Sequence, residues 1–205
     1  MRVLILTQTL NNYLPLARIT NENKMEYCDR HGYSFMCFYG LYNELAIGLQ
    51  KSFLMQHMLP GYDLIHWQDI DSYIMNFNTK IEDLVDDSHG LWVGRDCNLT
   101  SGGSFIVANN AMGWKVLNEM EVLAPAYNWH YLFESQMIED MSYRCPEIAV
   151  VENRRFNSYF EDLYERDNEL ERFQRGDFLL HLATLEVQHR IDIIKSERVQ
   201  GQIIK

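Results

Sequence analysis

Apolar runs without polar alternation recur along this 205-residue chain, and helix-like segments separate them. Strands of this kind, buried on both faces, are typical of parallel sheets that are covered by helices on each side. The expected strands lie at residues 1–6, 34–38, 63–67, 91–95, 104–108, 147–151 and 177–183. The expected helices lie at residues 16–30, 44–59, 110–122, 129–142 and from 185 onward. The pattern predicts an α/β sandwich with a central, largely parallel sheet flanked by helices.

The length and the 47% hydrophobic content suit one packed domain over residues 1–205, and the sequence has no linker or internal repeat. Clusters of aromatic and methionine residues are expected in the core. They are Phe35, Met36, Phe38, Tyr39, Met137 and Met141. The charged run at 161–175 is expected to be a solvated helix, with a segment covering a site as the alternative.

The formal net charge of −11 argues against nucleic acid as a partner, because phosphates would be repelled. The first ten residues are too quickly polar for a signal peptide, and no apolar run approaches the ~20 residues of a membrane span. The four cysteines are scattered without a CxxC pair, which favours reduced thiols over disulfides. We therefore expect a soluble chain in the cytoplasm, or in the host cytoplasm if it is viral. The oligomeric state is not predictable.

Two aspartates, Asp69 and Asp71, follow the expected strand at 63–67 directly. Residues i and i+2 of an extended segment point the same way, so both carboxylates can face one point. Two negative charges at such a short distance repel each other, so a positive charge must compensate for them. A divalent cation such as Mg²⁺ or Mn²⁺ would do so, because it suits hard carboxylate oxygens. An ordinary turn with solvated acids is the alternative interpretation.

An ion held by two carboxylates at a strand end keeps open coordination positions, which diphosphate oxygens fill naturally. Such an ion stabilises the charge that develops on a leaving nucleoside diphosphate. This chemistry is that of a nucleotide-sugar glycosyltransferase. A Rossmann dehydrogenase and a serine hydrolase are disfavoured, because the chain lacks both GxGxxG after its first strand and a Gly-x-Ser-x-Gly elbow.

Further motifs occur in a fixed order along most of the chain. They are 23-NKMEYCDRHGY-33, Lys51, 67-WQDIDSYIMN-76, 96-DCNLTSGGSFIVANN-110, 134-ESQ-136, 153-NRRFNSY-159 and 176-GDFLLHLA-183. In this order the motifs resemble those of metal-dependent GT-A glycosyltransferases, in particular the α-galactosyl, α-mannosyl and xyloglucan xylosyltransferase family of fungi and plants. The resemblance implies a single Rossmann-like GT-A domain.

The resemblance also implies roles for particular residues. Asp71 and His181 would be direct ligands of Mn²⁺ (or Mg²⁺), and Asp69 would contact the ribose and the metal. The residues implied in binding a UDP-sugar donor are Thr7, Gln8, Thr9, Lys51, Asp69, Ile70, Gly102 and Gly103. The implied catalytic residues are Gln136 beneath the anomeric carbon, its acidic neighbour Glu134, and Asp96 at the sugar. Asn157 and Asp177 are expected to be structural.

Three departures from the family pattern stand out. Ser101 replaces the family's asparagine before the glycines, and 183-ATLE-186 replaces its Ala-Gly segment, with Glu186 where a basic residue near the diphosphate is expected. The 205 residues are also far fewer than in the fungal and plant enzymes, and we expect a minimal form without their membrane anchor. A bacterial, phage or viral source is the expectation.

The main hypothesis is a Mn²⁺-dependent, retaining transferase that moves a hexose or pentose from a nucleoside diphosphate, UDP by preference, to a saccharide acceptor. Glu134 and Asp96 would act if the route is covalent or base-assisted. A metal-dependent hydrolase of nucleotide sugars is the second hypothesis. A non-catalytic sugar-nucleotide binding module is the third.

Overall fold

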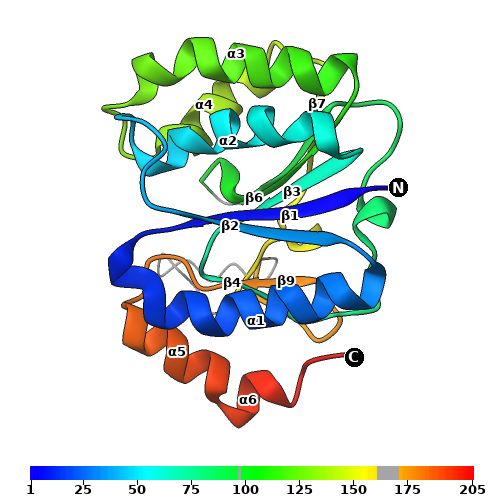
Figure 1. Cartoon of the computed structure of the whole chain (residues 1–205), viewed down its shortest axis with the longest axis vertical. Helices are drawn as coiled ribbons and strands as arrows, with labels where there is room; N and C mark the ends of the chain where they lie inside the picture. The colour runs from blue at the N-terminus through cyan, green and yellow to red at the C-terminus, as the bar shows by residue number, and fades with distance from the viewer. Residues whose placement is uncertain (97, 161–170) are drawn as a thin grey trace.

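A six-stranded sheet forms the centre of the computed structural model, which describes residues 1–96, 98–160 and 171–205 (Figure 1). Its strands lie in the order β2-β1-β3-β6-β5-β7. Their bounds are β1 Val3–Thr9, β2 Ser34–Tyr39, β3 Leu64–Gln68, β5 Leu91–Arg95, β6 Thr100–Ala108 and β7 Ile148–Glu152. The pairs β1–β2, β1–β3 and β5–β7 are parallel, and β6 runs antiparallel to β3 and β5. The predicted α/β architecture with a mostly parallel central sheet is confirmed.

Helices cover both faces of this sheet (Figure 1). One face carries α2 Gln50–Met58, α3 Ala111–Tyr127 and α4 Phe133–Ser142. The other side carries α1 Leu14–His31, α5 Val187–Lys195 and α6 Glu197–Gln200. Short 3₁₀ turns lie at Asn11–Tyr13, Ile47–Leu49, Leu59–Gly61, Ile81–Leu84 and Asn153–Arg155.

Helix α1 shows how local sequence sets these bounds. Pro15 lies in its first turn, where the missing N–H costs nothing, and Gly32 ends it in the left-handed conformation with φ of 70°.

No helix in the described part of the chain is long and apolar enough to cross a membrane.

A second, three-stranded sheet lies beside α1 on the same side of the central sheet, and α1 contacts both β2 and β4 (Figure 1). Its strands are β4 Ser72–Ile74, β9 Leu179–His181 and β8 Ser158–Tyr159, with β9 in the middle. The expected strand at 177–183 is therefore shorter and belongs to this sheet. Strands of two or three residues are too short for periodicity to reveal, so β4 and β8 were not predicted.

Strand β2 forms an edge of the central sheet, and the expectation that its side chains are core holds only in part, because Phe35 and Phe38 are partly buried against the core. Met36 and Tyr39 are exposed, whereas Met137 and Met141 of α4 are buried as expected. An edge strand keeps one flank and part of each face in solvent, and the pattern of β2 alone does not reveal its edge position.

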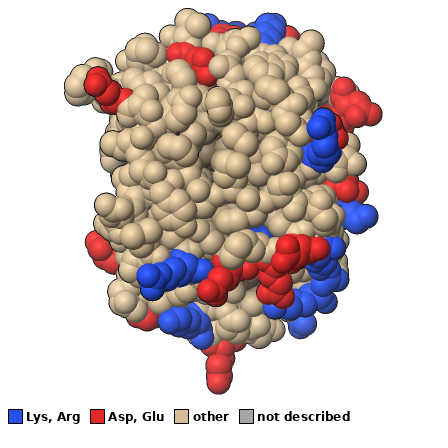
Figure 2. Space-filling view, viewed as in Figure 1, with Lys and Arg blue, Asp and Glu red and all other residues tan. Residues whose placement is uncertain are grey.

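The view in Figure 2 shows an uncharged surface across the middle of the molecule, with charged side chains gathered mainly below it, around α1 and α5.

Two other segments differ from the expectation. Of the charged run at 161–175, residues 161–170 lie outside the described residues, and Arg172 forms a β-bridge with Tyr159 instead of lying in a helix. Strand β6 begins at Thr100, earlier than the expected strand at 104–108, and includes Gly102 and Gly103. Both glycines are part of this strand, and side chains of Glu134 and His181 occupy the space that a Cβ would fill.

Candidate active site

The two aspartates lie on a tight turn between the two sheets. The backbone N–H of Asp69, just after β3, donates to the carbonyl of Gly103 at 2.8 Å. The N–H of Ser72 donates back to the carbonyl of Asp69 at 3.0 Å, which closes the turn and starts β4. Asp69 therefore belongs to the end of the central sheet, and Asp71 leads into the small sheet.

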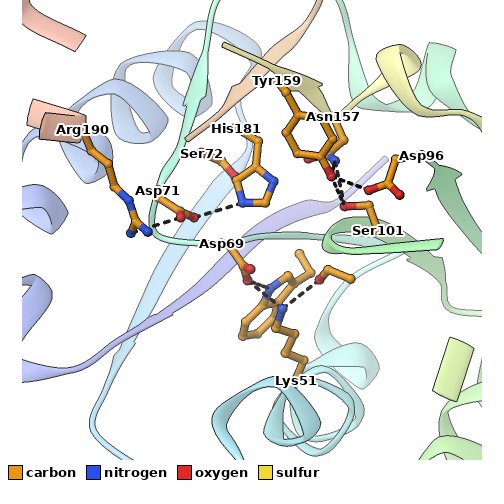
Figure 3. Close-up of polar contacts among 12 residues, drawn as sticks. Lys51, Asp69, Asp71, Ser72, Asp96, Ser101, Asn157, Tyr159, His181 and Arg190 are labelled. Carbon is orange, nitrogen blue, oxygen red and sulfur yellow. Dashed lines mark hydrogen bonds and ion pairs between the residues drawn. The ribbon is translucent and has the colours of Figure 1, made fainter. Parts of the chain in front are cut away.

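His181 reaches Asp71 through strand pairing. Strands β4 and β9 are antiparallel, with Ser72 opposite His181, and the N–H of Leu182 donates to the carbonyl of Asp71. His181 Nε2 lies 3.2 Å from Asp71 Oδ1 (Figure 3). Ligand atoms of Asp69, Asp71 and His181 all lie within 4.8 Å of one another. The structure thus brings together the three residues that were expected to hold a metal.

This donor set fits a divalent cation. Two carboxylates and one imidazole match the preferences of Mn²⁺, and Mg²⁺ would favour the oxygens. The Nδ1 atom of His181 is buried and has no hydrogen-bond partner among the described residues. A buried polar atom without a partner is costly, so the imidazole is suited to a ligand rather than to packing. Burial alone would raise the pKa of Asp71, but His181 and Arg190 outweigh it and hold that pKa well below its usual range.

Arg190 of α5 corrects the expectation that no basic residue follows His181 near the site. Its Nη1 lies 3.2 Å from Asp71 Oδ2, and its side chain is almost fully buried (Figure 3). Its Nε has no partner among the described residues. Glu186 stands where the family has its basic residue, and Arg190, one helical turn later, supplies a positive charge instead. The signal in the sequence was that Arg190 is the first arginine or lysine after His181.

Lys51 of α2 holds the other side of the site. Its Nζ lies 2.8 Å from Asp69 Oδ1 and 2.5 Å from Glu134 Oε1, and it donates to the carbonyl of Gly102 at 2.8 Å. Burial alone would lower the pKa of Lys51, but Asp69 and Glu134 together raise it above its usual range. The indole N–H of Trp67 also donates a hydrogen bond to Asp69 Oδ1, at 2.7 Å. Lys51 is therefore fixed as a cation between two carboxylates.

Two cavities of about 230 Å³ each open beside these groups. Asp69, Asp71 and Glu134 line both of them. The first, which we call the inner cavity, also has Gln8, Thr9, Leu10, Tyr13, Ile47, Gly48, Lys51, Trp67, Ile70, Phe133 and Arg190 in its wall. The second, the outer cavity, also has Asp96, Asn98, Leu99, Thr100, Ser101, Gly103, Leu132, Ser135, Tyr159, His181, Ala183 and Thr184 in its wall. The carboxylates lie between two adjoining spaces.

The predicted donor-binding residues are distributed unevenly over these cavities. Gln8, Thr9, Lys51 and Ile70 line the inner cavity, but Thr7 lies inside β1 and is fully buried. The amide nitrogen of Gln8 donates to Gln50 and to the carbonyl of Gly40, and its Oε1 has no partner among the described residues. Gln8 therefore retains a free acceptor beside the cavity.

Gly102 and Gly103 make room for side chains of the site. A Cβ at Gly102 would lie 2.5 Å from Cγ of Glu134, and one at Gly103 would lie 2.3 Å from Cε1 of His181. Real Cβ contacts are never so close, so any other residue here would displace Glu134 or His181. The expectation was that these glycines let the backbone approach the donor sugar. The structure shows that they admit Glu134 and His181.

Asp96 ends a buried polar network that reaches the outer cavity (Figure 3). Its Oδ2 accepts from the hydroxyl of Tyr159 at 2.7 Å, and Asn157 donates to Ser101 Oγ at 2.7 Å and to the Tyr159 hydroxyl at 3.2 Å. Burial, followed by the charge of Asp96, raises the pKa of Tyr159 well above its usual value. Ser101, the departure from the family's asparagine, is thus part of a connected network.

Helix α4 presents Glu134 and Ser135 to the site but not Gln136. The hydroxyl of Ser135 accepts from the N–H of Gly102 at 2.9 Å, and Ser135 lines the outer cavity. The amide of Gln136 donates to Asp140 at 2.8 Å, and Gln136 lines neither cavity. Successive helical residues are about 100° apart, so Gln136 lies about 200° around the helix from Glu134. The role of Gln136 beneath the donor sugar therefore stays a prediction from the family resemblance.

Two residues with strained backbone lie in the walls of the two cavities. Phe133 and Thr184 are the non-glycine residues with positive φ in the described part of the chain, at 33° and 64°. Phe133 lines the inner cavity and Thr184 lines the outer one. Such conformations cost on the order of 1–3 kcal/mol each and cluster at functional sites.

The expected structural roles of Asn157 and Asp177 agree with their contacts. Asn157 joins the network around Ser101. Asp177 accepts from Arg154 at 2.7 Å and from Ser158 at 2.7 Å, which fixes β8 beside β9. Sequence reasoning gave no role to Arg190, Ser135 or Tyr159. Ser135 and Tyr159 lie within the motifs at 134–136 and 153–159, but only the tertiary structure shows that their side chains reach the site, and Arg190 lies in no motif.

A model of the galactosyl transferase GMA12/MNN10 family matches residues 2–91, which include β1, Lys51 and the aspartate pair. No curated protein sequence matches the chain. Solved structures match over much more of it. A glycosyltransferase involved in glycosylation of the major capsid of PBCV-1 is 17% identical, covers 95% of this chain and 99% of that one, and superposes with a TM-score of 0.76.

Two further structures share the fold at lower similarity. The galactosyltransferase LgtC is 9% identical, with coverage of 98% and 100% and a TM-score of 0.55. Mouse xyloside xylosyltransferase 1 is 10% identical, with coverage of 90% and 98% and a TM-score of 0.57. The family match and the fold together indicate a glycosyltransferase. Its GT-A architecture and the resemblance stated from the motifs are confirmed.

Proposed function

We propose that this glycosyltransferase takes its sugar, a hexose or pentose, from a nucleoside diphosphate, UDP by preference, and transfers it to a saccharide acceptor with retention of anomeric configuration. We propose Mn²⁺, or Mg²⁺, as the cofactor. The observation that carries the proposal is the convergence of Asp69, Asp71 and His181 within 4.8 Å at the meeting point of two cavities. We assign the whole of residues 1–205 to one catalytic domain.

The inner cavity is suited to the nucleotide. The free Oε1 of Gln8 can accept an N–H such as that of a uracil ring, and Thr9 lies beside it. Asp69 is placed to accept from a ribose hydroxyl, and Ile70 supplies apolar wall. Arg190 brings a positive charge to the inner cavity beside Asp71, in addition to that of Lys51, and both charges would favour a diphosphate there.

The outer cavity is suited to the transferred sugar and the incoming acceptor. A divalent ion, when bound, supplies positive charge that stabilises the departing diphosphate. The bond from the anomeric carbon to the diphosphate oxygen breaks, a bond to the acceptor oxygen forms on the same face, and the acceptor proton leaves with the diphosphate. Glu134 borders both cavities and is placed to stabilise positive charge on the sugar. Asp96, held by Tyr159, is placed to bind a sugar hydroxyl.

Retention rests on the family resemblance, and Glu134 and Asp96 are the carboxylates for a covalent or base-assisted route. The family resemblance predicts a role for Gln136 at the anomeric carbon, whereas the contact of its amide with Asp140 favours no direct role, and mutation decides between the two. A cytoplasmic location is likewise proposed, supported by the free thiols of Cys28, Cys37 and Cys145.

The test is nucleotide release from a panel of UDP- and GDP-sugars with Mn²⁺, with Mg²⁺ or with EDTA, for the wild type and Asp71→Ala. We expect slow, metal-dependent release from one donor, lost in the variant and accelerated by a saccharide. Fast release that is indifferent to every acceptor would favour a hydrolase. No release from any donor, together with no metal-dependent nucleotide binding, would contradict the proposed function.

A further inference from the structure

The connection between α3 and α4, residues 128–132, carries the two most exposed large apolar side chains in the described part of the protein. Trp129 is 91% exposed and Tyr131 is 83% exposed. Aromatic rings are large apolar surfaces, and leaving two of them in water so close together in sequence is costly unless they meet a ligand. The pair lies outside the motifs from which the donor and metal sites were predicted.

This connection is continuous with the wall of the active site. Leu132 lines the outer cavity and Phe133, with its positive φ, lines the inner one. In Figure 1 the end of α3 lies on the same side of the molecule as the turn after β1, whose last residues line the inner cavity. Trp129 and Tyr131 are therefore within a few residues of both cavities.

The connection is also anchored. The side-chain oxygen of Asn128 accepts from the N–H of Ala46, next to α2, at 2.7 Å. The N–H of Leu132 donates to Nδ1 of His130 at 3.1 Å, and the N–H of His130 donates to the carbonyl of Tyr127 at 2.9 Å. These bonds hold the backbone on either side of Trp129 and Tyr131, and aromatic side chains have few rotatable bonds, so binding would cost little entropy.

We propose that Trp129 and Tyr131 form a platform that binds the saccharide acceptor by stacking against the apolar face of a pyranose ring. The inference rests on the proposed function, since an acceptor is needed only for transfer. The face of an aromatic ring is electron-rich and attracts the polarised C–H bonds of a sugar. The platform suits a neutral saccharide, because three carboxylates already lie between the two cavities.

Binding can be measured without turnover. The indole N–H resonance of Trp129, assigned by its disappearance in Trp129→Phe, would be followed during titration with maltose, cellobiose, lactose and xylobiose at millimolar concentrations. We expect at least one of these disaccharides to shift this resonance. No shift with any of them would overturn the proposal. This readout does not depend on donor turnover, so it separates failure of the platform from failure of the proposed function.

Kinetics test the role in transfer with the disaccharide that most accelerates donor turnover. We expect Trp129→Ala and Tyr131→Ala each to raise the acceptor KM about tenfold more than the donor KM, and Trp129→Phe to restore most of the loss. Tyr143→Ala is the matched control, because Tyr143 is an aromatic residue exposed at 73% that lines neither cavity. Equal acceptor KM values in the wild type and both alanine variants would overturn the proposal. Self-association in sedimentation experiments, lost in Trp129→Ala without a change in acceptor KM, would also overturn it.

Discussion

The central sheet and the small sheet each hold one half of the active site, and the two halves differ in how well their polar groups are satisfied. The large-sheet half consists of Lys51, Asp69 and Glu134, which pair with one another. The small-sheet half consists of Asp71, His181 and Arg190, in which His181 Nδ1 and Arg190 Nε have no partner among the described residues. Satisfied buried ion pairs hold a fold in place, whereas buried polar atoms without partners are suited to a ligand. We infer that Lys51 in the large-sheet half mainly holds Asp69 and Glu134 in place and that the small-sheet half mainly binds.

The largest effect on activity is expected from Asp71→Asn in the small-sheet half. Loss of this carboxylate should reduce transfer about 10³-fold, because the charge that holds the cation at the diphosphate is removed. Steady-state transfer rates at saturating Mn²⁺ measure this. Asp192→Asn, an exposed carboxylate on α5, is the control and should keep full activity. Activity of the Asp71 variant within tenfold of wild type would contradict the metal assignment.

Lys51→Met should instead lower the free energy of unfolding, by about 3 kcal/mol, because it leaves the carboxylates of Asp69 and Glu134 without their buried cation. Urea denaturation measures the change. The matched control is Lys115→Met, since Lys115 pairs with Glu147 at 2.5 Å but its side chain is 58% exposed. That control should cost less than about 1 kcal/mol. Equal losses in the two variants would show that the large-sheet half is not a structural support.

Gly103→Ala tests the contact between the two halves, because Gly103 belongs to the central sheet and a Cβ there meets His181. We expect activity to fall about 100-fold and the Mn²⁺ concentration for half-maximal activity to rise, since a displaced ligand weakens the site. Gly61→Ala is the control, because no atom lies within 4 Å of the added Cβ there. An unchanged Mn²⁺ dependence in Gly103→Ala would mean that His181 is not a ligand.

Lys24 joins α1 to the small sheet, and its shifted pKa predicts how the stability of the fold changes with pH. Its Nζ donates to the carbonyl of Ser72 at 2.7 Å, and burial lowers its pKa from 10.5 to about 8. Between pH 8 and 10.5 the unfolded chain binds a proton that the folded chain has released, so this residue makes stability rise with pH. The difference in unfolding free energy between wild type and Lys24→Met should rise by about 1.5 kcal/mol from pH 8 to 9.5. A flat difference in urea titrations would contradict the shifted pKa.

The smallest effect is expected at Gln136. Its amide is directed to Asp140, so Gln136→Ala should change kcat less than about twofold, whereas Glu134→Gln should reduce kcat at least about tenfold. Transfer assays of the two variants, with circular dichroism to confirm folding, measure this contrast. A large loss in Gln136→Ala with normal Glu134→Gln would restore the role first expected for Gln136.

The sequence by itself determined the alternation of strands and helices, the aspartate pair and the distant histidine, because these depend on local periodicity and on short motifs. It also predicted the functional class through motif order. Tertiary structure alone decided that β4 and β9 pair with Ser72 opposite His181, that Gln136 faces away from the cavities, and that Arg190 replaces the missing basic residue. Strands of two or three residues carry no detectable period, and the direction of a helical side chain depends on where its helix begins and docks. These features arise from contacts between residues that are far apart in the sequence. Asp71 and His181, for example, are 110 positions apart, and no local pattern encodes such a contact.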